Sequence, residues 1–235
     1  MNRVLVLFDI DGTLLLSGGA GRRAIHAALA DEAGIPPDVV DHIRFDGKTD
    51  PQIVGELLDA AGHPAPHAQD RVDRVLERYL FHLEADLAVT AHQATVMPGV
   101  FPLLQALGSD ERVVLGLLTG NVSRGAVIKL RAVSIEPDQF RVGAYGSDHA
   151  VRAALPPIAA ERAEPLFGRR PAGSEIVIIG DTPADVTCGQ SVGARSVGVA
   201  TGSFRPADLS RAGAHHVFDD LSDTARVAAA ILGDA

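Results

Sequence analysis

The sequence predicts an α/β fold in which a doubly wound parallel sheet is interrupted by an all-helical insertion. Short apolar segments typical of buried strands alternate with helical segments, once near the N-terminus and again from about residue 100 onward. This alternation is typical of a parallel sheet with helices on both faces. Residues 16–92, in contrast, contain only helical patterns. We therefore expect a core domain of residues 1–15 and 93–235 and a helical domain of residues 16–92.

The composition argues against nucleic-acid and membrane partners. The chain has 235 residues, 46% of them hydrophobic, a net charge of −9 and no basic cluster. Because binding to nucleic acid requires concentrated positive charge, we expect no nucleic-acid partner. The single Cys188 rules out an internal disulfide. No apolar run has the length of a membrane span or the flanks of a signal peptide, so we expect a cytoplasmic protein without a membrane partner.

The first expected strand, Val4–Leu7, leads into two carboxylates. Asp9 and Asp11 lie two residues apart, so on an extended chain they point to the same face. Two like charges held this close are unfavourable unless a cation sits between them or one carboxylate binds a proton. A bare D-x-D pattern is more often a solvated strand end, but the apolar strand before it and Gly12-Thr13 after it favour a divalent-cation site.

The helical segment begins with an expected flexible link, 15–21, and is predicted to contain three helices. The first covers 22–33, the second follows an N-cap at Asp50 and extends to about residue 61, and the third covers 68–87. The loop before the second helix carries Lys48. This lysine could reach a substrate from the helical domain or could be an exposed loop charge, and the sequence does not decide between them.

The remaining segments restore the strand and helix alternation. We expect helices near 98–107, 123–133 and 183–193, and strands at 112–118, 139–145, 175–179, 195–200 and 216–218. Residues 148–167 have helical tendency, but Pro156, Pro157 and Pro165 argue against a single straight helix.

Polar side chains follow three of the expected strands. They are Asp9 and Asp11 after the first strand, Thr119 after the strand at 112–118, and Asp181 with Asp185 after the strand at 175–179. Ligands bind at the carboxyl ends of strands in open parallel sheets, so neighbouring strands would bring these groups into one pocket.

Several segments carry a family resemblance. FDIDGTLL at 8–15 resembles the first motif of the haloacid dehalogenase superfamily of phosphohydrolases. LLTGN at 117–121 and GDTPAD at 180–185 are similar to its second and fourth motifs. MPGV at 97–100 and GAHHVF at 213–218 resemble the phosphoglycolate phosphatase-like branch. The resemblance covers the whole chain and implies a Rossmann-like core with a helical cap domain of the C1 type.

By this resemblance, the protein is a phosphatase of small phosphorylated metabolites, with 2-phosphoglycolate as the first candidate substrate. Asp9 is the nucleophile that forms an aspartyl-phosphate, and Asp11 protonates the leaving alcohol and later deprotonates water. Thr119 and the neighbouring Gly120 and Asn121 hold the phosphoryl oxygens.

The resemblance also implies a Mg²⁺ site. Its ligands would be the Asp9 carboxylate, the backbone carbonyl of Asp11 and the Asp181 carboxylate, with Asp185 binding the ion directly or through water. Oxygen ligands of this kind suit a hard divalent cation.

The third family motif, a Lys or Arg that steadies the nucleophile and phosphate, departs from its usual form. A lysine followed closely by proline is absent ahead of residue 180. Lys129 lies on the helix after Thr119 and could reach back, because helical side chains lean towards the N-terminus. Arg152 lies nearer the usual motif position. We favour Lys129, because only two lysines occur in the chain, and keep Arg152 as the alternative phosphate-binding group.

Other functions are weighed against this one. Asp11 argues against a dehalogenase or a phosphonatase, whose first motifs lack the second aspartate. A β-phosphoglucomutase-like phosphotransferase shares the catalytic residues and stays open. A catalytically silent binding protein of the same fold is disfavoured, because Asp9, Asp11, Thr119 and Asp181 are all present.

Overall fold

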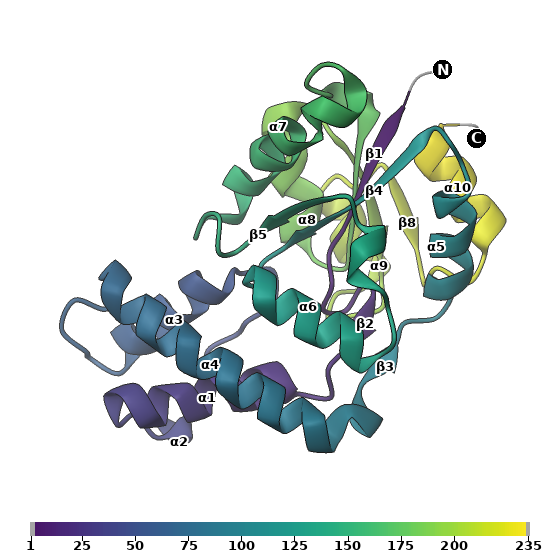
Figure 1. Cartoon of the computed structure of the whole chain (residues 1–235). Helices are drawn as coiled ribbons and strands as arrows, with labels where there is room; N and C mark the ends of the chain where they lie inside the picture. The colour runs from purple at the N-terminus through teal and green to yellow at the C-terminus, as the bar shows by residue number, and fades with distance from the viewer. Residues whose placement is uncertain (1–2, 234–235) are drawn as a thin grey trace.

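A six-stranded parallel sheet forms the centre of the computed structural model, which describes residues 3–233 (Figure 1). The strand order is β5-β4-β1-β6-β7-β8, and every neighbouring pair is parallel. This confirms the predicted fold class. The strands are β1 (Val4–Phe8), β4 (Val113–Thr119), β5 (Val142–Tyr145), β6 (Ile176–Gly180), β7 (Arg195–Val199) and β8 (His216–Phe218).

The period of two along β1 divides its side chains between two hydrophobic clusters. Val4, Val6 and Phe8 join the cluster under one face of the sheet, and Leu5 and Leu7 join the cluster under the other. A strand buried on both faces reads as a continuous apolar run, as this one does. Helices α5 (Val100–Gly108), α6 (Ser123–Ala132) and α10 (Thr224–Leu232) contribute to the first cluster. Helices α7 (Leu155–Phe167) and α8 (Pro183–Cys188) contribute to the second, and α9 (Pro206–Arg211) packs beside β7 and β8.

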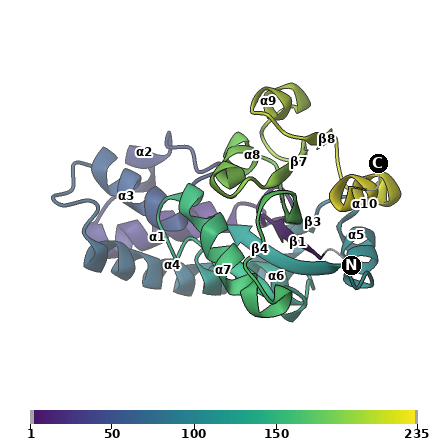
Figure 2. The same cartoon turned by 90° about the horizontal axis from the view of Figure 1, so that it is seen from above.

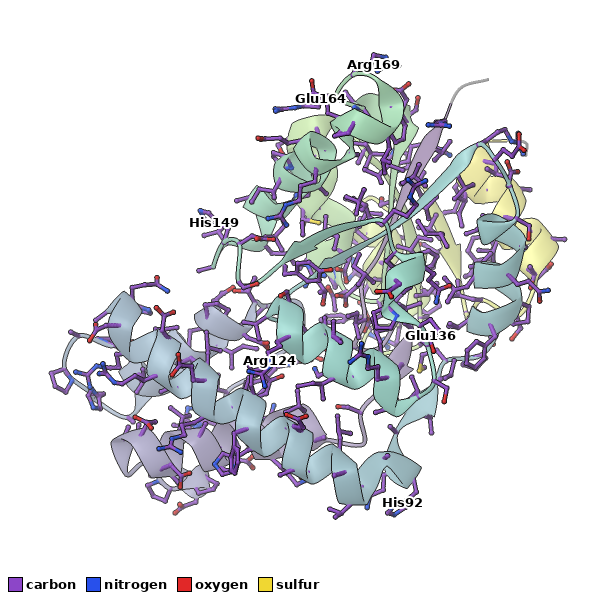
Figure 3. The ribbon with its side chains drawn as sticks, viewed as in Figure 1. His92, Arg124, Glu136, His149, Glu164 and Arg169 are labelled. Carbon is purple, nitrogen blue, oxygen red and sulfur yellow. The ribbon has the colours of Figure 1, made fainter. Side chains whose placement is uncertain are left out.

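The helical insertion extends from one end of the sheet, on the side away from the chain termini (Figures 1 and 2). It contains α1 (Ala20–Ala33), α2 (Pro37–Val40), α3 (Asp50–Ala60) and α4 (Gln69–Thr90). These helices share a third hydrophobic cluster, in which Tyr79 and Leu83 of α4 are fully buried. The cluster also takes in Val122 just before α6, so the insertion packs on the core. At this contact, Arg124 of α6 lies 3.7 Å from Glu84 of α4 (Figure 3).

The connection between the sheet and the insertion is more ordered than we predicted. The segments entering and leaving the insertion pair as two short antiparallel strands, β2 (Leu15–Leu16) and β3 (Thr95–Val96). Leu15 is fully buried. Helix α1 then begins at Ala20, inside the segment that we expected to be a flexible link. A two-residue strand leaves too weak a pattern in the sequence to distinguish it from a linker.

Two other local predictions also need correction. Thr49, not Asp50, is the N-cap of α3, and its hydroxyl accepts a hydrogen bond from the Gln52 backbone N–H at 3.3 Å. Helix α7 is a single helix despite its prolines, after one turn of 3₁₀ helix at Arg152–Ala154. Pro156 and Pro157 lie in its first turn, where no intrahelical N–H is required. Among residues 3–233, none of the helices is long and apolar enough to cross a membrane.

We predict that Gly99→Ala destabilises the fold strongly. Gly99 precedes α5 with φ of 81°, and a Cβ there would lie 2.0 Å from the backbone carbonyl of Leu221. The clash and the left-handed backbone together should lower the free energy of unfolding by about 3 kcal/mol or more.

Gly34→Ala is the matched control, because Gly34 has φ of 66° and no described atom within 4 Å of the place that an added Cβ would take. It should lose only about 1 kcal/mol. Urea unfolding measures both, and equal losses would contradict the packing described at Gly99.

Candidate active site

A cavity of about 400 Å³ lies where the sheet meets the insertion. Strand β1 pairs with β4 on one side and β6 on the other, so the residues that follow these strands meet at one edge of the sheet. The cavity is lined from the core by the groups that the sequence places after those strands, namely Asp9, Asp11, Thr119, Gly120, Asn121 and Asp181, together with Lys129 and Arg152. The insertion lines the other side, with Lys48 among its residues.

Three carboxylates crowd together at the base of this cavity. Asp9, Asp181 and Asp185 are all buried, and each offers an oxygen within 4.8 Å of the others. Burial raises the pKa of Asp9 to about 6, although Arg152 opposes the shift. Burial, together with the Asp185 and Asp9 carboxylates, raises the pKa of Asp181 to about 9. Such mutual repulsion is relieved when a divalent cation binds between the oxygens, so this donor set fits a hard metal ion.

Local structure fixes each of these carboxylates. Asp185 lies in the first turn of α8, where its carboxylate accepts hydrogen bonds from the Thr182 N–H at 3.0 Å and hydroxyl at 2.7 Å. Asp181 accepts a hydrogen bond from the Thr13 hydroxyl at 3.2 Å. A Cβ at Gly12 or Gly202 would lie within 2.4 Å of the Asp181 carboxylate. The glycine in the first motif is therefore required by the close approach of Asp181, and Gly202 makes room on its other side.

Arg152, which the sequence offered as the alternative to Lys129, contacts Asp9. Its Nη2 lies 3.0 Å from Asp9 Oδ1, and the same nitrogen bonds to the Asp185 carboxylate. Although burial disfavours the charged guanidinium, the Asp185 and Asp9 carboxylates raise the pKa of Arg152 further. The 3₁₀ turn before α7 brings Arg152 under the end of β1. Arg152, and not Lys129, therefore contacts the predicted nucleophile, and the number of lysines in the chain could not indicate this.

Lys129 contacts the other aspartate. Its Nζ donates to both oxygens of the Asp11 carboxylate, at 2.9 and 2.7 Å, and to Asn121 Oδ1 at 2.6 Å. Asn121 Nδ2 in turn donates to Asp11 at 2.7 Å and to the Thr119 hydroxyl at 2.8 Å. The Asp11 side chain therefore turns towards α6 and away from the three crowded carboxylates. Of the predicted metal ligands, the structure groups the side chains of Asp9, Asp181 and Asp185.

A loop of the insertion is docked tightly on the core beside the cavity. The Asp50 N–H donates to the Gly120 carbonyl at 2.8 Å, and the Thr49 hydroxyl donates to the Ala150 carbonyl at 2.6 Å. A Cβ at Gly120 would lie 2.0 Å from the Lys48 carbonyl. Lys48 lines the cavity, and its ammonium forms an ion pair with Glu56 of α3. It thus faces the site, with part of its charge already balanced.

Asp50 is a buried residue that the sequence did not mark as part of the site. Its carboxylate accepts a hydrogen bond from the Val122 N–H at 2.8 Å. Burial raises the pKa of Asp50 to about 6, while Lys129 and this hydrogen bond oppose the shift. We had interpreted Asp50 as a helix cap, because an aspartate before proline is a strong N-cap signal. The contact to Val122 joins residues 72 positions apart, and no local pattern reports it.

Similarity to known proteins agrees with this geometry. Residues 151–224 match the HAD-hydrolase-like family model. Phosphoglycolate phosphatase from Cereibacter sphaeroides is 28% identical over 226 residues, which cover 94% of this chain and 97% of that protein. These similarities support a haloacid dehalogenase-like hydrolase. Its relatives lie in the phosphoglycolate phosphatase-like branch of that superfamily.

Solved structures share the fold of this hydrolase. A hydrolase from Pseudomonas syringae aligns with a TM-score of 0.70 at 24% identity, over 96% of this chain and 97% of that one. A candidate β-phosphoglucomutase from Bacteroides vulgatus aligns with a TM-score of 0.67 at 18% identity, over 99% of this chain and 90% of that one. At these identities, the likeness concerns the fold.

We predict that Asp50 makes the stability pH-dependent. Its pKa is about 6 in the folded protein, against 3.8 for an exposed aspartate. Between these values the folded state holds more protons, so the free energy of unfolding should fall as pH rises through this window. Asp50→Asn removes this pH-dependent contribution, because Asn does not titrate. Its side-chain carbonyl can still accept the hydrogen bond from the Val122 N–H. Relative to the wild type, the variant should gain roughly 2.4 kcal/mol between pH 4 and pH 7.

Urea unfolding at a series of pH values measures this difference. Asp59→Asn, at an exposed position on the same helix, is the control, and its difference from the wild type should stay constant with pH. A difference between wild type and Asp50→Asn that does not change from pH 4 to pH 7 would contradict the burial of Asp50.

Proposed function

We propose that the protein is a magnesium-dependent phosphatase that hydrolyses a small phosphomonoester through an aspartyl-phosphate on Asp9. The observation that carries the proposal is the position of the Asp9 carboxylate. It is buried at the base of the cavity, 3.0 Å from the Arg152 guanidinium and beside Asp181 and Asp185. A carboxylate in this setting can approach an anionic phosphate, because positive charge lies beside it.

The proposed chemistry has two steps. An oxygen of Asp9 attacks phosphorus, the bond from phosphorus to the ester oxygen breaks, and Asp11 gives a proton to the departing alcohol. Asp11 then takes a proton from water, which attacks the phosphorus and frees Asp9. The Thr119 hydroxyl and the N–H of Gly120 would hold phosphoryl oxygens, and both residues line the cavity. A Mg²⁺ ion held by Asp9, Asp181 and Asp185 would supply charge that offsets the repulsion between nucleophile and phosphate.

The insertion acts in this proposal as the cap, residues 16–92, over the core of residues 1–15 and 93–235. Its loop at 47–50 docks on Gly120, and its helices line the side of the cavity opposite Asp9. A cap of this kind excludes water and contacts the leaving group. Arg22 and Lys48 give the cap side of the cavity two cations, which suits a leaving group that itself carries negative charge.

The first candidate substrate is 2-phosphoglycolate, since the relative from Cereibacter sphaeroides, one of several with near full-length coverage, is named for it. The cavity of about 400 Å³ also admits larger phosphomonoesters, and a β-phosphoglucomutase-like transfer uses the same residues. The two reactions differ in product. A phosphatase releases inorganic phosphate, whereas a mutase converts β-glucose 1-phosphate to glucose 6-phosphate without net release.

We predict Mg²⁺-dependent release of phosphate from 2-phosphoglycolate and from p-nitrophenyl phosphate. EDTA should abolish it, and Asp9→Asn should lower turnover by about 10³-fold or more because the nucleophile is lost. Asp59→Asn, which removes an exposed aspartate of the insertion, serves as the control for the substitution itself.

A phosphate-release assay over a panel of phosphorylated metabolites, with β-glucose 1-phosphate included, measures these outcomes. Activity that persists in Asp9→Asn would contradict the assignment of Asp9 as the nucleophile. Absence of Mg²⁺-dependent turnover on the whole panel would contradict the phosphatase proposal, and isomerisation of β-glucose 1-phosphate without phosphate release would favour the mutase.

A further inference from the structure

The Lys129 ammonium is enclosed and fully engaged. The residue is 4% exposed, and its three N–H groups have three acceptors within 2.9 Å, namely the two Asp11 oxygens and Asn121 Oδ1. An ammonium has three protons to donate and cannot accept. Every donor of Lys129 is therefore committed to the Asp11 carboxylate and to the amide beside it, and none is left over for a phosphoryl oxygen.

Asp11 depends on these contacts for its orientation. Its side chain is 42% exposed to the cavity, in contrast to the buried carboxylate of Asp9. The Asp11 side chain accepts from Lys129 and Asn121, and Asn121 is itself held by the Thr119 hydroxyl. Without Lys129, a half-exposed aspartate would be free to adopt other rotamers in the cavity. Misplacement of a proton donor by about 1 Å is enough to cost a large factor in rate.

The cap encloses the Lys129 side chain from the other direction. A Cβ at Gly21 of α1 would lie 3.3 Å from Nζ, so the first cap helix passes directly over the ammonium. The acidic groups that face Lys129 are Asp11, Asp50 and Asp9, and Asp50 belongs to the cap. The ammonium is therefore held between the core and the cap.

We propose that Lys129 is a positioning residue that, with Asn121, fixes the Asp11 carboxyl group for proton transfer to the leaving oxygen. The inference rests on the proposed phosphatase function and deepens it. When the phosphorus–oxygen bond of the ester breaks, its electron pair stays on the alcohol oxygen, and the proton that this oxygen takes comes from Asp11. Lys129 keeps all of its protons and touches neither the phosphoryl group nor the substrate.

This role can be separated from phosphate binding by the leaving group. An alkyl alcohol is a poor leaving group that needs a proton, whereas p-nitrophenolate leaves without one. Loss of a positioned acid should therefore lower kcat/KM for alkyl phosphates far more than for p-nitrophenyl phosphate. Loss of a phosphate-binding cation should lower both alike. The comparison uses kcat/KM, because this parameter reports only the steps up to release of the alcohol. The later hydrolysis of the aspartyl-phosphate does not affect it.

The test compares Lys129→Met with the wild type on 2-phosphoglycolate, glycerol 3-phosphate and p-nitrophenyl phosphate. We expect kcat/KM to fall about 100-fold on the alkyl phosphates that the wild type turns over and less than about 10-fold on p-nitrophenyl phosphate. Asp11→Asn should show the same selective loss. In the Asp11→Asn background, followed by single turnover on the alkyl phosphates, Lys129→Met should cost less than about 3-fold, because the two residues act as a unit.

Equal losses on all three substrates, or losses that multiply in the double variant, would overturn the inference. Asn121→Ala provides the same readout if Lys129→Met does not fold, since it removes one donor to Asp11 and one acceptor of Lys129. A wild-type protein that is inactive on every substrate would instead count against the phosphatase proposal. An active wild type with unselective variants would count against the role of Lys129 alone.

Discussion

The burial of three carboxylates around one point is the constraint on which the rest of the site depends. Asp9, Asp181 and Asp185 lie within 4.8 Å of one another, with Arg152 as the cation in contact with two of them. One guanidinium cannot balance three ionised carboxylates. Burial, and then the neighbouring carboxylates, raise the pKa of Asp9 and of Asp181. A site built this way favours a divalent cation, and then a phosphate whose charge the cation shares.

Asp11 and Lys129 form a second ion pair beside these carboxylates. Asp11 is two residues from Asp9, yet it is held by Lys129 and Asn121, whereas Asp9 is held by Arg152. The two aspartates of one motif therefore pair with different cations, Lys129 of α6 and Arg152 of the 3₁₀ turn before α7. Lys129, which holds Asp11, borders the cap at Gly21 and faces Asp50. In the proposed mechanism, this separation gives Asp9 a place beside the carboxylates that would hold the metal ion and leaves Asp11 to serve the leaving group.

The fold class and the acidic residues after the strands could be predicted from the sequence, because both leave local patterns in it. The alternation of apolar strands and helices, with polar residues directly after three strands, predicted the sheet and the meeting of Asp9, Thr119 and Asp181. The sequence could not show which aspartate Lys129 and Arg152 each contact. These contacts depend on how α6 and the turn before α7 pack on the sheet. From the sequence we also interpreted Asp50 as a helix cap and the segment that contains β2 as a flexible link. In both cases the deciding partner is distant in the chain.

The most direct test of the account is thermal unfolding of the wild type and of Asp181→Asn during a titration with Mg²⁺. The account predicts that Mg²⁺ raises the midpoint of the wild type in a concentration-dependent way, since an ion bound only to the folded state stabilises it by about 2.7 kcal/mol at 100 times its Kd. Asp181→Asn, with one ligand lost, should respond far less. A wild-type midpoint that Mg²⁺ leaves unchanged, or an equal rise in both proteins, would contradict the metal site on which the account rests.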